Sequence, residues 1–363
     1  MILLSEYEDL VMNKDRIKWI DICKAIAIIF VFVGHWNCLH FKVFSNAFHL
    51  KLFFLLSGIF ACKAVEKYKF KDYFINKCKH ILIPMFIWMF IGILISNFDK
   101  FFNIHDLIFQ LKDIRHIYPN WWFFPAIFTI SILYYFMKKI FKKNFLVLIV
   151  SYLLLIIFGK YGIFGSIVSK ICSNNLLLSY VYLEAFIAYV FWFSLGAFLF
   201  PIINKFISNK NNSKINNISF HSIGIISILI SSVLFLYDID KIGFIQNHIV
   251  NHNFLLVNYT IVTSFIIIIS VIYISTFFEN SKLLENIGKT TMAHMGLEFI
   301  VKDLLILYIV PLFKIQGELI PASSMMIFVI IQFIICHFII KYIITYLPIL
   351  NGEWKKKKEI KES

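Results

Sequence analysis

Three ionisable residues in the first apolar segment, Asp21, Lys24 and His35, have a spacing that could support acid–base chemistry. On a helix, Lys24 and His35 come within ~20° of one another and lie ~16 Å apart along the axis, and Asp21 falls within ~40° of the same line. A charged group at membrane depth costs at least ~3 kcal/mol and usually faces a polar interior. The spacing therefore favours one reactive, water-accessible helix face. Two plainer interpretations stay open: Asp21 and Lys24 could form a simple ion pair near the membrane boundary, and His35 could cap a span at the interface.

The composition predicts that these residues belong to a helical membrane protein. The 363 residues are 60% hydrophobic and only 15% charged, and the mean hydropathy is +0.80. Soluble domains are usually about half apolar and a quarter charged. Apolar runs long enough to cross a hydrocarbon core of about 30 Å recur along the chain, and no short alternating strands are visible. We therefore expect an all-α polytopic membrane protein.

About ten transmembrane helices are expected, and the charge of their loops predicts their orientation. Basic residues concentrate in alternate loops, with six lysines in residues 63–79, four in 138–143 and five in the tail sequence KKKKEIK. Because positively charged loops stay on the cytoplasmic side, both the N- and the C-terminus are predicted to be cytoplasmic. The expected spans are residues 17–37, 47–65, 80–97, 121–137, 144–159, 176–200, 217–237, 254–277, 290–312 and 322–347.

The same composition argues against several other classes of protein. The net charge of +14 is interpreted as a topology signal and not as a nucleic-acid-binding surface. The six cysteines show no paired spacing, so neither a disulfide framework nor a metal site is expected. The first apolar run starts late and contains Asp21 and Lys24, so no cleavable signal peptide is expected.

Seven short motifs, in consistent order from residue 16 to residue 352, resemble those of the acyltransferase 3 family of membrane O-acyltransferases. In the first motif, the family's pattern of a basic residue, ten residues and a histidine is reproduced by Lys24 and His35. The last two motifs resemble the sugar-modifying branch of the family, the fucose 4-O-acetylase-like proteins. The motifs are RIKWIDICKAIAIIFVFVGHW (16–36), FHLKLFFLLSGIF (48–60), DYFINKCKHILIPMFIW (72–88), NWWFFPAIF (120–128), FWFSLGAFLF (191–200), IGKTTMAHMGLEFIV (287–301) and YLPILNG (346–352).

This resemblance implies acyl transfer to a carbohydrate hydroxyl from acetyl-CoA, which would be a substrate and not a permanently bound cofactor. A sugar hydroxyl is a weak acid that needs a base, and histidine, with an unperturbed pKa of about 6.5, suits that task. His35 is therefore the expected base, and Lys24 and Asp21 complete the expected catalytic set. At the cytoplasmic surface, the phosphates of CoA are expected to contact Arg16, Lys18, Lys77 and Lys79, although each lysine alone could serve only as a topology signal.

Four further residues, His49, Ser57, Trp122 and Glu298, are expected to bind the acceptor or to support the site. Each has a plainer alternative: an interfacial anchor for His49, close helix packing for Ser57 and a place in the aromatic belt for Trp122. Glu298 precedes Lys302 in the favourable i,i+4 order, which favours a structural ion pair. The functional alternative is a polar wall of an acyl-transfer tunnel.

The resemblance therefore implies a membrane O-acetyltransferase, expected in the bacterial cytoplasmic membrane, that modifies a cell-surface polysaccharide or its lipid-linked precursor. Its transmembrane domain is expected over residues 17–350, between cytoplasmic tails at 1–16 and 351–363. The expected partners are acetyl-CoA, the glycan and the lipid bilayer; the oligomeric state stays open. Two alternatives remain. One is a flippase or exporter of lipid-linked oligosaccharide. The other is a catalytically inactive relative, because Glu298 and His80 stand where the family often has histidine and arginine.

Overall fold

The computed structural model describes eight stretches of the chain, and their backbone is almost entirely helical. They are residues 17–36, 39–96, 122–159, 162–174, 183–208, 214–236, 253–309 and 322–354. No β-strand occurs within these stretches. The expected all-α fold is therefore confirmed for the described part of the chain.

The helices follow the apolar runs of the sequence, and several end at the basic or polar residues between those runs. Their bounds are α2 Lys18–His35, α3 Leu39–Lys67, α4 Phe70–Lys77, α5 Ile83–Ser96, α8 Phe123–Phe141, α9 Asn144–Phe158, α10 Gly165–Asn174, α12 Leu183–Ser208, α13 Lys214–Leu236, α15 Asn253–Phe277, α16 Lys282–Lys289, α17 Thr291–Leu304 and α18 Ala322–Tyr346. Single π-helical turns, Cys78–Leu82 and Leu305–Ile309, join α4 to α5 and extend α17.

Seven helical segments of the described residues are long and apolar enough to cross a membrane. They are Phe41–Lys67, Phe70–Gly92, Phe123–Phe141, Ala185–Ile207, Asn216–Leu236, Leu255–Phe277 and Met326–Tyr346. The other three expected spans correspond to α2, to α9, which has 15 residues, and to α17. The count of ten spans and the cytoplasmic placement of the termini stay predictions.

The basic stretch 63–79 differs from the expected loop. Helix α3 continues to Lys67 and α4 begins at Phe70, so this stretch consists mostly of two helix ends around a short connection. The third expected span correspondingly starts about ten residues before position 80, at Phe70. Lysine has a high helix propensity and a long apolar stem, so a helix can continue beyond the apolar run before the chain turns.

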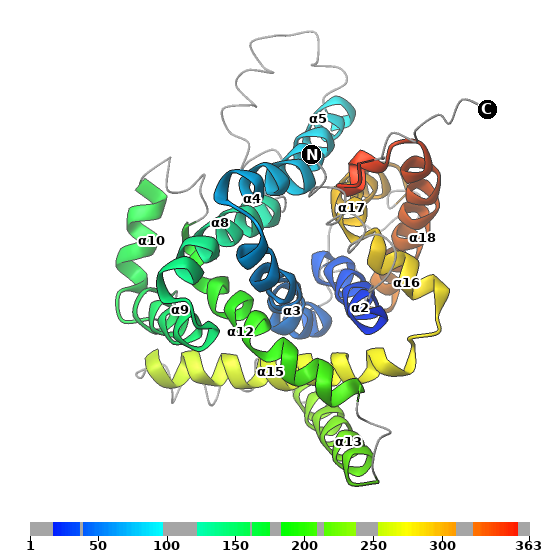
Figure 1. The fold of residues 1–363 in the computed structure, drawn as a ribbon. Helices are drawn as coiled ribbons and strands as arrows, with labels where there is room; N and C mark the ends of the chain where they lie inside the picture. The colour runs from blue at the N-terminus through cyan, green and yellow to red at the C-terminus, as the bar shows by residue number, and fades with distance from the viewer. Residues whose placement is uncertain are drawn as a thin grey trace, which may run out of the picture.

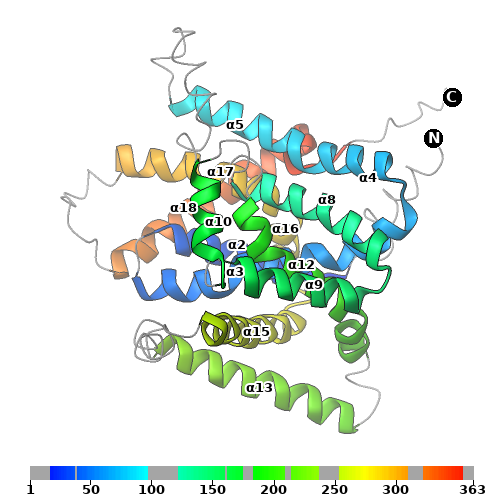
Figure 2. The same cartoon turned by 90° about the vertical axis from the view of Figure 1, so that its left-hand side faces the viewer.

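Most of the longer helices run side by side, with α2 and α3 in the middle of the bundle (Figures 1 and 2). Helices α16, α17 and α18 cover one side of α2, and α12 follows α3 on the other side. Helix α15 crosses below α2 and α3, and α13 lies outside it (Figure 2). Every residue of α2 from Trp19 to Cys23 is buried. Most of the helix that carries the first motif is buried by other parts of the protein.

Glycines set the closest helix contacts around α2 and α3. A Cβ at Gly58 of α3 would lie 1.8 Å from the carbonyl oxygen of Phe193, and one at Gly196 of α12 would lie 1.9 Å from that of Leu55. Reciprocal contacts of this kind let two backbones touch, as small residues do in membrane helix pairs. Gly288 likewise brings α16 against the backbone of Asp21 in α2.

Candidate active site

A contact between His35 and Glu298 forms the centre of the candidate site. His35 is the last residue of α2, and Glu298 lies 263 positions later in α17. Nδ1 of the imidazole lies 2.8 Å from Oε2 of the carboxylate. The side chain of Glu298 is 1% exposed, whereas that of His35 is 26% exposed. An ionised carboxylate only accepts hydrogen bonds, so its contact with a neutral imidazole requires the proton on Nδ1 and leaves Nε2 as the acceptor.

Three further hydrogen bonds hold α2, α17 and α18 around this pair. Nζ of Lys302 donates to the backbone carbonyl of His35 at 2.6 Å. The indole Nε1 of Trp36 donates to Oε1 of Gln332 at 2.7 Å. Nε2 of Gln332 in turn donates to the backbone carbonyl of Glu298 at 2.7 Å. The imidazole and the carboxylate are therefore positioned by two buried side chains, Trp36 and Gln332, and by the half-buried Lys302.

Glu298 and Lys302, which the sequence predicts to form an ion pair with each other, both contact His35. Each side chain makes its own contact with His35, Glu298 through the imidazole and Lys302 through the carbonyl oxygen. The i,i+4 spacing does place both groups on one face of α17, and His35 at the end of α2 offers each of them a partner. The contact of Glu298 with the His35 imidazole agrees with the functional alternative, in which Glu298 belongs to a polar interior wall.

His35 opens into a cavity of about 360 Å³ between α2, α3, α17 and the start of α8. This volume lies within the range of roughly 300–1,000 Å³ typical of small-molecule sites. The lining residues are Val31, Gly34, His35, Lys42, Asn46, His49, Leu50, Trp122, Phe123, Met295 and Lys302. A half-exposed imidazole in a cavity of this size can meet a bound hydroxyl.

Two of the predicted acceptor residues, His49 and Trp122, line the same cavity. Nδ1 of His49 donates to the carbonyl of Ser45, one turn earlier in α3, at 2.5 Å. The Trp122 ring stacks against Tyr189 of α12, with 5.8 Å between centroids and 29° between planes. Both side chains are thus held in place by neighbouring protein groups at the wall of the cavity.

Asp21 and Lys24 lie at the other end of α2. Fourteen residues of helix place Asp21 about 21 Å from His35 along the axis. Nζ of Lys24 lies 3.5 Å from Oδ1 of Asp21. The contact expected from the plainer interpretation is therefore present, and neither residue lines the cavity at His35. The shared helix face that the spacing predicts does not bring these two groups to the imidazole.

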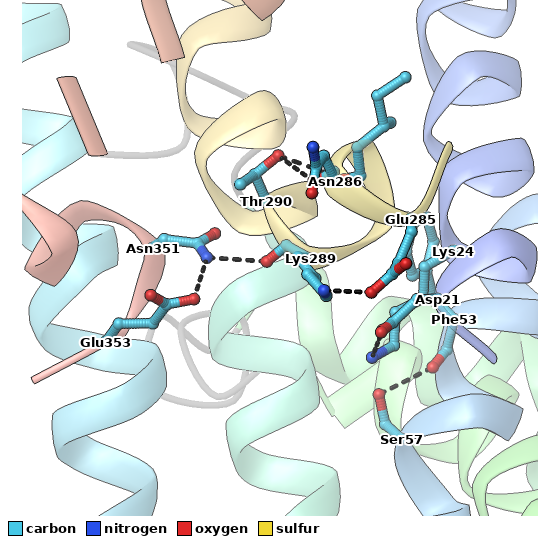
Figure 3. A network of polar contacts seen from close by, with 11 residues as sticks. Asp21, Lys24, Phe53, Ser57, Glu285, Asn286, Lys289, Thr290, Asn351 and Glu353 are labelled. Atoms are coloured by element: carbon cyan, nitrogen blue, oxygen red, sulfur yellow. Dashed lines mark hydrogen bonds and ion pairs between the residues drawn. The ribbon is translucent and has the colours of Figure 1, made fainter. Parts of the chain in front are cut away.

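A group of polar residues from three segments gathers at this end, and we call it the Asp21 cluster: Asp21, Lys24, Glu285, Lys289, Asn351 and Glu353 (Figure 3). Lys289 forms an ion pair with Glu285 within α16. Nδ2 of Asn351 donates to the carbonyl of Lys289 at 2.8 Å and to Oε1 of Glu353 at 2.9 Å. These contacts tie residues 348–354 to α16, which itself packs against Asp21 through Gly288.

Ser57 appears beside the Asp21 cluster (Figure 3), and it does not line the cavity at His35. Its Oγ donates to the carbonyl of Phe53, one turn earlier in α3, at 2.8 Å. The adjacent Gly58 makes the close contact with α12 described above. This geometry agrees with the interpretation of the Ser57–Gly58 pair as a helix-packing motif.

Two of the predicted donor-binding residues, Lys18 and Lys79, lie exposed at the same end of the molecule as the Asp21 cluster. Lys18 is the first residue of α2. The ammonium group of Lys79 lies 5.8 Å from the ring centroid of Trp354, next to Glu353. Lys77 is partly buried, with its ammonium group 5.4 Å from the ring centroid of Tyr73. Arg16 lies outside the described residues.

Comparison with known proteins identifies the family. A family model described as an acyltransferase domain, the acyltransferase 3 model, matches residues 17–345. The chain belongs to the acyltransferase 3 family. It is accordingly an integral membrane protein with an acyltransferase domain, and the matched residues include His35, the cavity around it and Glu298. No significant match is found among curated protein sequences or among solved structures.

Several residues of the site were not among the sequence predictions. Lys42 and Asn46 precede the expected second span, in which the structure extends the helix back to Leu39. Gln332 is a polar residue in the middle of an apolar run, and Trp36 follows His35 directly. A buried glutamine in a membrane helix is itself a signal for an interhelical hydrogen bond, so Gln332 was accessible to sequence analysis.

Proposed function

We propose that this acyltransferase 3 protein is an O-acetyltransferase that moves an acetyl group from acetyl-CoA to a sugar hydroxyl of a cell-surface polysaccharide or its lipid-linked precursor. The fucose 4-O-acetylase-like branch is the part of the family that its closing motifs resemble. The observation that supports the proposal best is the contact between the half-exposed imidazole of His35 and the buried carboxylate of Glu298.

In the proposed reaction His35 acts as general base and Glu298 as its positioning residue. Nε2 of His35 takes the proton of the acceptor hydroxyl as the oxygen attacks the thioester carbonyl. The new C–O bond forms, the C–S bond breaks, and the proton passes from the imidazole to the departing thiolate, which leaves as CoA. The carboxylate of Glu298 holds the imidazole in the tautomer that can accept at Nε2 and stabilises the imidazolium that forms.

The acceptor is proposed to bind in the cavity, against His49 and the Trp122 ring. Aromatic rings offer flat apolar surface to the C–H faces of sugars, and polar side chains at the wall can orient hydroxyls. The donor phosphates are proposed to contact Lys18, Lys79, Lys77 and Arg16 at the end with the Asp21 cluster. Asp21 and Lys24 then belong to the donor side and not to the proton-transfer step.

The two proposed subsites are separated by most of the length of α2, about 21 Å from Asp21 to His35. An acetyl group must cover this distance, either on the long pantetheine arm of the donor or through an acyl-enzyme intermediate. The lysine-rich end is proposed to be cytoplasmic, where acetyl-CoA is made, and the cavity at His35 is proposed to lie towards the outer surface.

The proposal is tested by the chemistry of the surface glycan in cells that carry only the wild-type gene, His35→Ala or the control His221→Ala. Nδ1 of His221 lies 2.8 Å from the hydroxyl of Tyr273, and His221 does not line the cavity, so it is a matched histidine. We expect ester-linked acetyl groups in the wild type and in the control but not in His35→Ala, at equal protein abundance and equal amounts of glycan. Acetylation that persists in His35→Ala contradicts the proposal, and loss of the glycan itself supports the flippase alternative.

A further inference from the structure

The carboxylate of Glu298 has one oxygen that its contact with His35 does not use. Oε2 lies 2.8 Å from Nδ1 of His35, whereas Oε1 is buried and has no hydrogen-bond partner within the described residues. Gln332 of α18 donates to the backbone carbonyl of Glu298 and not to this oxygen. A buried polar atom without a partner is costly, and most such atoms are satisfied by protein groups or by ordered water. Oε1 is therefore expected to accept a hydrogen bond in the folded protein.

A second acceptor, Nε2 of His294, lies one helical turn before Glu298 on the same face of α17 and also has no partner in the described part of the chain. Nδ1 of His294 lies 2.8 Å from the carbonyl oxygen of Thr290, and the Thr290 hydroxyl donates to the carbonyl of Asn286. A carbonyl only accepts, so this contact places the proton of a neutral imidazole on Nδ1 and leaves Nε2 as the acceptor. His294 is fully buried, which favours the neutral imidazole because a buried charge is costly.

Packing holds the His294 ring in one orientation. Its centroid lies 5.6 Å from that of Phe333 and 5.9 Å from that of His337, with interplanar angles of 22° and 24°. Residues four apart on a helix have Cβ atoms about 6 Å apart, so the side chains of His294 and Glu298 are neighbours. Two acceptors cannot bond to each other, but one buried water molecule can donate a hydrogen to each of them.

We infer that His294 is a second positioning residue of the proposed base and that it acts through a water molecule bonded to its Nε2 and to Oε1 of Glu298. The hydrogen bonds then run from the Thr290 carbonyl through His294, the water and Glu298 to Nδ1 of His35. They hold the carboxylate in the orientation that orders His35 and stabilises its imidazolium. This inference rests on the proposed function and adds a residue that does not line the cavity.

His337 of α18 is the alternative partner of this water, because its Nδ1 is likewise buried without a partner among the described residues. His337 is partly exposed, whereas His294 is fully buried and shares a helix face with Glu298. These differences favour His294, and the experiment includes a variant of each histidine.

The test measures kcat and KM for acetyl transfer by the purified full-length protein in lipid nanodiscs. The donor is radiolabelled acetyl-CoA, and the acceptors are the envelope glycans and glycolipids of a strain of the source organism from which the gene is deleted. His294→Phe keeps an aromatic ring in the stack but removes both nitrogens. We expect its kcat to fall by about tenfold, the effect of losing one hydrogen bond to a charged group, and its KM for acetyl-CoA to stay within about twofold.

Two further variants separate the hydrogen bond from the packing. His294→Gln, whose amide oxygen can accept from the same water, should recover most of the wild-type kcat. His337→Phe replaces the other imidazole of the stack and should keep the wild-type kcat. If His294→Phe does not fold, His294→Leu takes its place.

A double variant shows whether His294 acts through the carboxylate. In the Glu298→Gln background we expect His294→Phe to change kcat by less than about twofold, because the charge that His294 positions is then gone. The inference is overturned by a tenfold loss in both backgrounds, by a wild-type kcat for His294→Phe, or by an equal loss for His337→Phe. Wild-type rates for His35→Ala and Glu298→Gln would instead contradict the proposed function itself.

Discussion

A histidine at the end of a membrane helix has no fixed tautomer unless a neighbour supplies one, and here the neighbour is Glu298. The carboxylate is buried and the half-exposed imidazole lines the cavity, and Nδ1 is the nitrogen that contacts the carboxylate. This asymmetry is what distinguishes the proposed base from an interfacial histidine. The proposed role of His35 therefore depends on Glu298, a residue that does not line the cavity.

Glu298→Gln tests this dependence at the residue scale. The amide keeps the size of the side chain but removes the charge that stabilises the imidazolium, so we expect kcat for acetyl transfer to fall by about 100-fold or more, with little change in KM. The measurement is the initial rate of acetyl transfer by purified protein in nanodiscs.

The matched control is Glu66→Gln, which removes an exposed carboxylate of α3 that pairs with Lys138. Its effect on the rate should stay within about twofold, as for most substitutions away from a site. A Glu298→Gln rate close to that of the wild type would show that His35 does not need the carboxylate.

The sequence alone identifies the ionisable residues of the site, but it does not show which of them are in contact. His35 was singled out because an imidazole in an apolar helix is costly, and Glu298 for the same reason. His35 and Glu298 are 263 positions apart, so their contact cannot be predicted from the sequence alone. The i,i+4 spacing instead predicts Lys302 as the partner of Glu298. Asp21 and Lys24 share a helix face with His35, but angular position does not shorten a distance along the axis.

At the scale of elements, α2 is positioned by glycines that let its neighbours approach. Gly288 brings α16 against Asp21, and Gly34 leaves room for Ser45 beside the cavity, since a Cβ there would lie 2.9 Å from the serine Oγ. On the far side of α3, Gly58 and Gly196 hold α12 in backbone contact. The cavity at His35 lies between helices whose separation these contacts set.

Gly58→Ala is expected to destabilise the bundle by about 3 kcal/mol, because the new Cβ would meet the Phe193 carbonyl and the two backbones must move apart. The readout is a lower Tm of the purified protein in detergent. The control is Ser57→Ala at the adjacent position, which removes only the hydroxyl that bonds the Phe53 carbonyl and should change Tm little.

The Ser57→Ala variant also tests whether the Ser57 hydroxyl takes part in the reaction. If Ser57 serves packing, Ser57→Ala keeps the wild-type rate of acetyl transfer. A Ser57→Ala variant with wild-type Tm but no acetyl transfer would instead indicate that this hydroxyl carries the acetyl group in an acyl-enzyme intermediate. An unchanged Tm for Gly58→Ala would show that the contact between α3 and α12 is looser than the structure has it.

The positions of the long helices could be predicted, because each helix follows an apolar run. The residues at which the helices begin and end could not be predicted. Helix α3 begins eight residues before the expected second span, at Leu39, and this extension carries Lys42 and Asn46 to the cavity. Hydropathy locates the part of a helix that lies in lipid, but the polar turns beyond it are set by tertiary contacts. Those turns supply part of the cavity wall.

At the scale of the whole molecule, the polar groups divide between the two ends of α2. The Asp21 cluster, Lys18 and Lys79 gather at one end, and the cavity with His35, Lys42 and Lys302 lies at the other. The first described helix and the last described residues meet at the same end, through the contacts of Gly288 with Asp21 and of Asn351 with Lys289. A donor on one side of a membrane and an acceptor on the other fit this division.

Acetyl transfer across inverted membrane vesicles tests the central claim most directly. Acetyl-CoA does not cross a bilayer, so radiolabelled acetyl-CoA added outside meets only the former cytoplasmic face, and the glycan acceptor is enclosed within the vesicles. For vesicles with the wild-type protein, we expect alkali-labile label on the enclosed glycan. For vesicles with an equal amount of His35→Ala protein, we expect less than a hundredth of that label. Equal labelling by the two proteins would contradict the account.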